Sequence, residues 1–141
     1  MLFRSACRAW FNLPEGQEAV KLSDLRGKVV VLMLWAGFDE SPRNKQHIAE
    51  MNALCTLYAD ATDVAIVSVH DGAATPQSVT QFIEQLGAAF PVGCDVESSE
   101  TFKRYRTGYV PQIVLIDKAG AVRFYITDGK LLELIKLLHR E

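Results

Sequence analysis

The chain has 141 residues, of which 49% are hydrophobic and 23% are charged. A chain of this length fits one domain that buries about two thirds of its unfolded surface, and the composition is that of an ordinary globular protein. The formal net charge of -2 at pH 7 argues against a nucleic-acid-binding protein, which needs a basic face. One small basic cluster, formed by Lys103, Arg104 and Arg106, is interpreted as the solvated side of a helix.

The N-terminal residues and the cysteines leave the cellular compartment open. No apolar run reaches the roughly 18 residues that a membrane-spanning helix requires, so we expect no membrane span. The first ten residues, MLFRSACRAW, lack the apolar stretch of a secretory signal. We expect a cytoplasmic protein from the chain as given, or a periplasmic one if an export signal has been removed. The cysteines, Cys7, Cys55 and Cys94, show neither CxxC nor metal-ligand spacing, so no disulfide framework, metal site or cofactor is predicted.

Two buried strands separated by a helix open the predicted domain. Residues 1–20 are treated as an N-terminal extension, and residues 21–141 as a single domain. The continuous apolar run from Val29 to Trp35 predicts a strand that is covered on both faces. Apolar residues then recur at helical spacing from Ser41 to Asp60, and a second buried strand is predicted from Val64 to Val69.

The second half of the chain continues the alternation of helices and strands. We predict a helix from Thr75 to the stop at Gly87, a strand from Phe90 to Val92, a short helix from Ser98 or Ser99 through Tyr105, strands from Pro111 to Asp117 and from Ala121 to Thr127, and a last helix around Leu131 to Leu138. The last two strands form a hairpin in which Gly120 takes a positive φ. The order predicts an α/β fold with a mixed sheet of about five strands and helices on both faces.

Three segments, taken in order, resemble the thioredoxin fold. These are LSDLRGKVVVLMLWA at residues 22–36, TGYVP at 107–111 and LIDKAG at 115–120. More narrowly, the chain is similar to the bacterial TlpA-type and AhpC/TSA (redoxin) branch, in which an αβ unit is inserted, here at about Thr75 to Asp95. The resemblance covers residues 21–141 and implies a three-layer sandwich.

The resemblance places the redox-active Cys-x-x-Cys motif at residues that contain no sulfur. The motif falls on Asp39-Glu40-Ser41-Pro42, so the nucleophilic cysteine becomes Asp39 and the resolving cysteine becomes Pro42. The single cysteine of a peroxiredoxin would fall at much the same place. At a helix start an ionised aspartate is stabilised by the helix dipole and is not activated as a base. We therefore interpret Asp39 and Ser41 as helix-capping residues.

His70 and Cys94 are the remaining candidates for chemistry, together with Asp39. His70 follows the second parallel strand, and the carboxyl ends of such strands line the functional crevice of open α/β sheets. A His–Asp or Cys–His pair there needs hydrogen-bond contact at about 3 Å; the alternative is an ordinary histidine at a loop start. We expect Cys94 to be exposed, next to an acid that disfavours its thiolate. Cys55 is expected to be a small buried apolar residue.

A binding surface is predicted at Phe38, Asp39, Val110 and Pro111. The resemblance implies a cis bond before Pro111, with the backbone of the preceding residue pairing with an extended peptide. The alternative is that Pro111 only starts an edge-facing strand. Phe38 is expected to be an exposed aromatic residue over this surface.

Three functions follow from these features. The preferred interpretation is a thioredoxin-fold protein without redox chemistry, a non-catalytic domain that binds a protein or an extended peptide. The alternative is a thiol-disulfide oxidoreductase or a peroxiredoxin-like antioxidant enzyme that uses Cys94. The third is a stabilising or dimerising module, since a homo-oligomer is compatible with the sequence.

Overall fold

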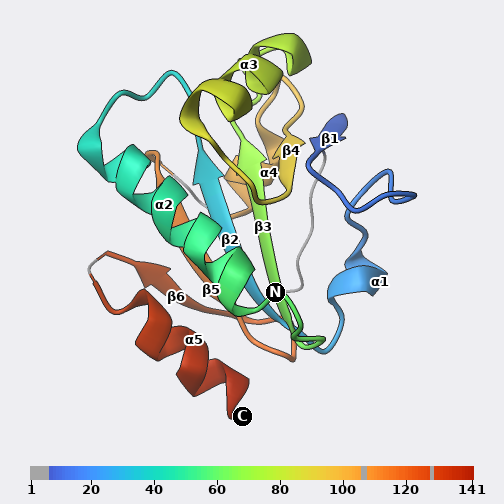
Figure 1. The fold of residues 1–141 in the computed structure, drawn as a ribbon, viewed down its shortest axis with the longest axis vertical. Coiled ribbons are helices and arrows are strands. Elements are labelled where there is room, and N and C mark those ends of the chain that lie inside the picture. Colours follow the sequence, from blue (N-terminus) through green and yellow to red (C-terminus); the bar gives the residue numbers. More distant parts are fainter. Residues whose placement is uncertain (1–6, 106–107, 128) are drawn as a thin grey trace.

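The computed structural model describes residues 7–105, 108–127 and 129–141 (Figure 1). The strands are β1 (Ala9–Phe11), β2 (Val29–Trp35), β3 (Val64–His70), β4 (Val92–Cys94), β5 (Gln112–Ile116) and β6 (Val122–Ile126). The helices are α1 (Leu22–Leu25), α2 (Pro42–Leu57), α3 (Pro76–Leu86), α4 (Glu100–Arg104) and α5 (Leu131–His139). The strands form one sheet in the order β1-β4-β3-β2-β5-β6. Strands β2, β3 and β4 are parallel, and β1, β5 and β6 are antiparallel to their neighbours. The predicted mixed sheet with helices on both faces is confirmed.

The sheet has six strands because the segment before residue 21 contributes β1. Ala9 pairs with Cys94 and Phe11 with Val92, in antiparallel register. The sequence did not predict this strand, since a three-residue strand shows no alternation and its partner lies more than eighty residues further along the chain. The N-terminal segment therefore closes one edge of the sheet.

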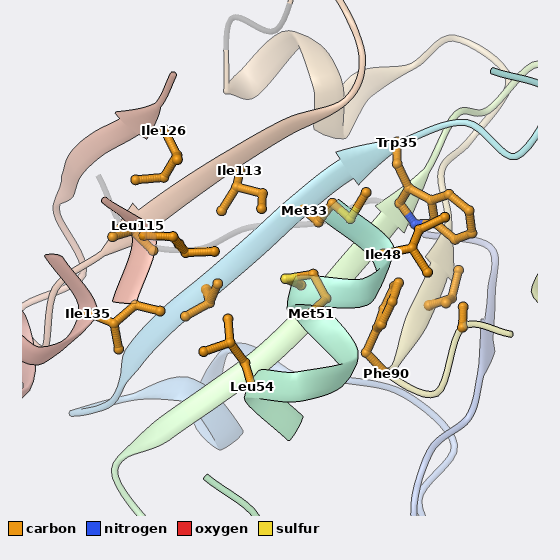
Figure 2. Packing of buried hydrophobic residues seen from close by; sticks show 14 of the residues in the cluster. Met33, Trp35, Ile48, Met51, Leu54, Phe90, Ile113, Leu115, Ile126 and Ile135 are labelled. Atoms are coloured by element: carbon orange, nitrogen blue, oxygen red, sulfur yellow. The ribbon is translucent and has the colours of Figure 1, made fainter. Parts of the chain in front are cut away.

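Strand β2 lies between two hydrophobic clusters, one on each face of the sheet. Every side chain from Val29 to Trp35 is at most 1% exposed. Its odd-numbered residues pack under α2, α3 and α5, where Met51 and Ile135 are fully buried (Figure 2). Its even-numbered residues pack under α1 and α4. Cover on both faces explains why this strand is a continuous apolar run.

Helices α2 and α3 begin as predicted, with an oxygen cap followed by proline. Ser41 Oγ accepts a hydrogen bond from the Asn44 N–H at 3.3 Å, and Thr75 Oγ1 accepts one from the Ser78 N–H at 3.2 Å. Helix α3 ends at Gly87, whose φ of 69° lies in the left-handed region that favours glycine. These local signals are therefore sufficient to place both helices.

Helix α4 is capped by a residue that the sequence analysis did not identify. Ser99 occupies the N-cap position but makes no side-chain cap, and its φ is 57°. Instead, the buried carboxylate of Asp95 accepts hydrogen bonds from the N–H groups of Thr101 at 3.0 Å and Phe102 at 3.3 Å. The negative charge beside Cys94 in the sequence is thus directed at α4.

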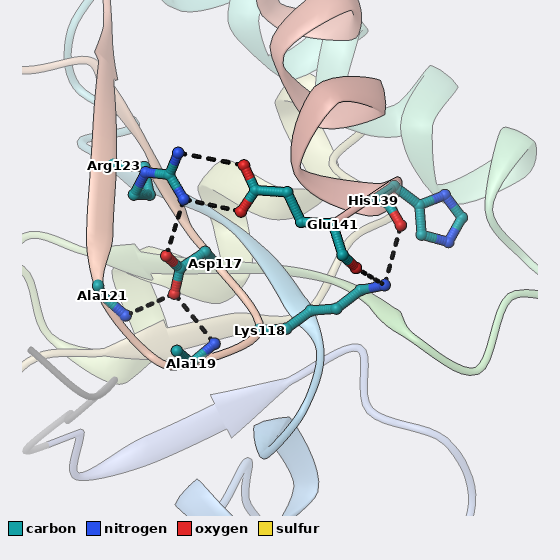
Figure 3. A network of polar contacts seen from close by, with 7 residues as sticks. All are labelled: Asp117, Lys118, Ala119, Ala121, Arg123, His139 and Glu141. Atoms are coloured by element: carbon teal, nitrogen blue, oxygen red, sulfur yellow. Dashed lines mark hydrogen bonds and ion pairs between the residues drawn. The ribbon is translucent and has the colours of Figure 1, made fainter.

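The end of α5 is tied to the β5–β6 hairpin by charged groups (Figure 3). Arg123 makes a bidentate contact with Glu141, at 2.8 and 3.1 Å, and a third contact with Asp117 Oδ2 at 3.0 Å. Asp117 Oδ1 also accepts from the N–H groups of Ala119 and Ala121. Burial raises the pKa of Asp117, but the hydrogen bonds from Ala121, Arg123 and Ala119 outweigh it and hold that pKa below its ordinary value.

Two further expectations concern the surface. Lys103 and Arg104 are exposed on α4, where Arg104 Nη2 lies 3.9 Å from Glu100 Oε2; Arg106 lies outside the described residues. Within the described ranges, every helix is too short or too polar to cross a lipid bilayer.

Candidate functional site

The start of α2 is built from two oxygen caps placed where the sequence resemblance puts cysteines. Asp39 Oδ1 accepts a hydrogen bond from the Ser41 N–H at 2.9 Å, and Ser41 in turn caps the first helical turn. Pro42 occupies the first helical position, where its missing N–H costs nothing. Asp39 is half-buried. The structure is consistent with the interpretation of Asp39 and Ser41 as helix-capping residues.

Asn44 holds the loop before α2 against the helix. Its side chain is 0% exposed, and its Nδ2 donates to the carbonyl oxygens of Ala36 at 3.1 Å and Asp39 at 3.0 Å. Sequence reasoning missed this residue. A usable signal was present, because Asn44 precedes the buried Ile48 and Met51 by four and seven residues and so lies on the buried stripe of the helix.

His70 is fully buried at the end of β3, and both of its ring nitrogens have partners. The Gly37 N–H donates to Nε2 at 2.7 Å, and Nδ1 lies 3.1 Å from the Asp71 carbonyl oxygen. Because Nε2 accepts a hydrogen bond, the proton of the neutral ring is on Nδ1 and is donated to Asp71. Burial lowers the pKa of His70, while the Asp71 carbonyl and the Asp71 charge oppose that effect.

Aromatic rings enclose the imidazole of His70. The Phe82 ring from α3 stacks on it with a centroid distance of 5.7 Å and an interplanar angle of 7°. Trp35 and Phe38 approach edge-on, at 4.9 and 6.4 Å. His70, at the end of β3, thus contacts side chains from β2, from α3 and from the loop before α2.

Cys94 is buried, so the expectation that it is exposed is wrong. Its side chain is 0% exposed, and its Sγ lies 3.7 Å from the Ala74 carbonyl oxygen. The same oxygen accepts a hydrogen bond from Arg8 Nη2 at 2.7 Å, and Arg8 also donates to the Gly72 carbonyl at 3.3 Å. The N-terminal segment therefore holds the 72–74 loop over the sulfur, a long-range contact that local sequence signals did not indicate.

The other two cysteines lie elsewhere. Cys55 is half-buried thirteen residues into α2, about 20 Å along the helix axis from its start. Burial raises the pKa of the Cys55 thiol. A Cβ at Gly93 would meet the Cys7 sulfur and the Trp10 ring, and adjacent strand residues point to opposite faces. Cys7 and Cys94 therefore lie on opposite faces of the sheet, in different hydrophobic clusters.

The carboxyl ends of the parallel strands bring Trp35, His70 and Cys94 into one row. Trp35 pairs in register with His70, and His70 with Cys94. Asp39 lies in the loop between β2 and α2. Between the residues that the structure describes, no hydrogen bond connects His70 to Asp39 or to Cys94. The elements that carry the three candidates thus meet at one edge, but the structure does not form the acid–base or thiol–imidazole pair that was considered.

Exposed aromatic side chains flank the same edge of the sheet. Phe38 is 57% exposed, as expected, and Tyr109, which sequence reasoning did not select, is 54% exposed. The Val110–Pro111 peptide bond is cis, as the resemblance implies. Pro111 is buried and immediately precedes β5, whose Gln112 pairs with Leu34. No group of three His, Cys, Asp or Glu side chains suited to a metal ion occurs among the described residues.

The mixed sheet, the oxygen-capped helix start at its carboxyl edge and the cis-proline beside it define a thioredoxin-like redoxin. The model of the AhpC/TSA family matches residues 8–125, and the chain belongs to this family. The thiol-disulfide isomerase from Corynebacterium glutamicum superposes with a TM-score of 0.82 at 25% identity, covering 100% of this chain and 97% of that chain. The three-layer thioredoxin-like fold is therefore confirmed.

Relatives by sequence include thiol-disulfide oxidoreductases named ResA and proteins named DipZ. ResA of Oceanobacillus iheyensis, named a thiol-disulfide oxidoreductase, is 36% identical over 118 residues, which cover 82% of this chain and 57% of that protein. Protein DipZ of Mycobacterium tuberculosis is 33% identical over 119 residues, covering 81% of this chain and 16% of that protein. The chain thus spans little more than half of this ResA and about a sixth of DipZ.

These relatives overturn the preferred interpretation of the sequence. A non-catalytic peptide- or protein-binding domain is wrong as the first choice, because the similar proteins are thiol-disulfide oxidoreductase enzymes. The chain has no CxxC pair, only scattered cysteines. The interpretation had inferred the absence of redox chemistry in the whole domain from the absence of sulfur at one helix start.

Proposed function

We propose that the chain is a thiol-dependent oxidoreductase that exchanges disulfides through one cysteine, Cys94. Membership of a redoxin family with oxidoreductase relatives supports the class of reaction. The choice of residue rests on position, because Cys55 lies far along α2 and Cys7 lies on the other face of the sheet. Of the three cysteines, Cys94 is the one that pairs in register with His70, which in turn pairs with Trp35.

The observation that carries the choice is the carbonyl oxygen shared by Cys94 and Arg8. Arg8 Nη2 is 2.7 Å and Cys94 Sγ 3.7 Å from the Ala74 oxygen. The guanidinium and the sulfur are therefore at most about 6.4 Å apart, a range in which opposite charges attract appreciably inside a protein. These contacts place the Arg8 guanidinium beside the Cys94 sulfur.

The exchange proceeds in two balanced steps. The Cys94 thiolate attacks one sulfur of a substrate disulfide, that S–S bond breaks, and the released thiolate takes up a proton while Cys94 stays in a mixed disulfide. A low-molecular-weight monothiol then attacks the substrate sulfur of the mixed disulfide, and Cys94 leaves as the thiolate. Because Cys94 has no exposed surface, the substrate reaches it when the 72–74 loop moves away.

The partner is a polypeptide in extended conformation that carries the disulfide. The docking surface on this chain lies at Phe38, Asp39, Val110 and Pro111. Pro111 is itself buried, and the Val110 backbone pairs with the substrate strand. Pro111 and Cys94 are separated by three strand spacings, about 14 Å at 4.7–4.9 Å each. Four or five extended residues, at about 3.3 Å per residue, span that distance.

A disulfide-exchange assay with matched cysteine variants tests the proposal. The substrate is a fluorescent peptide disulfide, and the reductant is glutathione. We expect the wild type to accelerate exchange, Cys94→Ser to lose at least about 90% of that acceleration, and Cys55→Ser to retain it. Equal activity in folded Cys94→Ser and wild type overturns the choice of residue, and a wild type without any activity overturns the proposed function.

Mass spectrometry of the wild type decides the matter even if the serine variant does not fold. The mixed disulfide is trapped with the peptide in the absence of glutathione, and the protein is digested without reduction. The peptide mass is expected on the fragment that contains Cys94. Its presence only on the fragments with Cys7 or Cys55 contradicts the proposal.

A further inference from the structure

The buried imidazole of His70 connects the sheet to the loop that carries part of the docking surface. We propose that His70 is a positioning residue, whose neutral ring holds Gly37 and Phe38 in place and whose protonation releases them. This inference deepens the proposed function by assigning a control to the same site. Its structural part, the coupling of His70 to Gly37, can be tested without any exchange activity.

The hydrogen bond from Gly37 to His70 depends on the protonation state of the ring. In the neutral ring Nδ1–H donates to the Asp71 carbonyl, and the Nε2 lone pair accepts from the Gly37 N–H at 2.7 Å. Protonation places a second N–H on Nε2, which then faces the N–H of Gly37. An accepting contact becomes a contact between two donors, and the bond is lost.

The neighbouring rings transmit this change to the loop. Gly37 lies so close to α3 that a Cβ at this position would overlap the Phe82 ring. Phe38 meets both the His70 ring and the Phe82 ring edge-on, at 6.4 and 6.5 Å. Phe38 is otherwise exposed. Its position is therefore defined by its contact with the His70 ring and by Gly37, the preceding residue, whose N–H is bonded to that ring.

The titratable and charged groups around His70, together with its burial, determine the pH at which the ring is protonated. Asp71 is the nearest carboxylate, and its Oδ1 accepts from the Ala73 N–H. Cys94 on β4 is the thiol beside the ring in register. Arg8 is bonded to the Gly72 and Ala74 carbonyls, and Asp39 to the Ser41 N–H. Burial outweighs the Asp71 interactions and lowers the pKa of His70. Gly37 and Phe38 are therefore released at a pH below the ordinary imidazole pKa of about 6.5.

Nuclear magnetic resonance of the 15N-labelled wild type tests the coupling. We expect the ring 15N shifts to show the Nδ1–H tautomer at neutral pH. As His70 is protonated, the Gly37 amide should exchange about tenfold faster, after correction for intrinsic exchange, with the same midpoint as the ring. An Nε2–H tautomer, an unchanged Gly37 amide, or a ring that stays neutral until the protein unfolds overturns the proposal.

Two variants give the matched controls. His70→Gln provides an acceptor that does not titrate, so the acid response of Gly37 should disappear while the fold is retained. His139→Gln removes a histidine that contacts Asp63 at 2.8 Å, away from the site, and should leave the response intact. A response that is lost in His139→Gln, or kept in folded His70→Gln, contradicts the assignment to His70. If His70→Gln does not fold, the wild-type titration decides.

A binding measurement separates this inference from the proposed function. The affinity for a peptide without a disulfide, which cannot undergo exchange, is measured with the Cys94→Ser protein above and below the His70 midpoint. We expect affinity to fall at least about threefold on protonation, with no such fall in the His70→Gln, Cys94→Ser double variant. An affinity that does not change while Gly37 is released overturns the control of docking. Absence of peptide binding at every pH, with the Gly37 response present, overturns the docking surface instead.

Discussion

Truncation of Asn44 is expected to destabilise the protein by about 2 kcal/mol. Asn44→Ala removes two hydrogen bonds, to the Ala36 and Asp39 carbonyls, each with a net contribution of about 1 kcal/mol. The Ala36 oxygen keeps the N–H of Asp39 as a donor, which limits the loss. Asn44 Oδ1 is buried and has no hydrogen-bond partner among the described residues, so its removal offsets part of the loss. The void left by the amide adds to the loss.

Urea unfolding followed by circular dichroism measures this effect, and a thermal scan should show a decrease in Tm of about 6 °C. Asn52→Ala is the matched control on the same helix. Asn52 also makes two hydrogen bonds, to the Gly87 carbonyl and from the Ala89 N–H, but there water can replace them, so we expect a loss below about 1 kcal/mol. A loss for Asn44→Ala that does not exceed the loss for Asn52→Ala would refute the argument that burial makes the Asn44 contacts important.

Three further changes test other parts of the structure. Gly37→Ala places a Cβ against the Phe82 ring, so we expect a loss of about 1–3 kcal/mol in urea unfolding; unchanged stability would show that the loop is not packed against α3. Asp95→Ala removes the acceptor that caps α4 and should cost about 1–3 kcal/mol, with faster amide exchange in α4, whereas Asp95→Asn should cost less. The pKa of Asp117 is lower in the folded than in the unfolded state. The ionised Asp117 therefore stabilises the folded protein at pH values above the ordinary aspartate pKa, and this contribution is lost as the pH falls through the folded-state pKa. Arg123→Gln should therefore lose less stability than the wild type between pH 7 and pH 3, and equal losses would contradict this role of the pair.

The fold was predictable where local signals determine structure. The apolar run of β2, the cap-and-proline starts of α2 and α3, and the positive φ at Gly120 each depend on a few adjacent residues. Strand β1 escaped prediction because only its pairing with β4 makes it a strand. The cap of α4 escaped because Asp95 reaches across a turn, whereas Ser99 was the nearer and more obvious residue.

The places of the candidate residues in the sheet were predictable, but their contacts were not. The carboxyl ends of parallel strands do gather Trp35, His70 and Cys94 at one edge, as topology requires. Sequence could not show that Arg8 would hold a loop over Cys94, since the partners lie more than sixty residues apart. Nor could it show that a backbone N–H from Gly37 would occupy the second nitrogen of His70.

The sheet also separates the sulfur atoms of Cys7 and Cys94. Cys7 precedes β1 and Cys94 ends the neighbouring β4, yet the two side chains belong to different clusters on opposite faces of the sheet. A disulfide requires Cβ atoms about 3.5–4.5 Å apart with converging directions, so these two cannot be joined without displacing the backbone. A disulfide between Cys94 and a sulfur of another molecule would be recognisable by its added mass, whereas a Cys7–Cys94 crosslink is not expected in the folded protein.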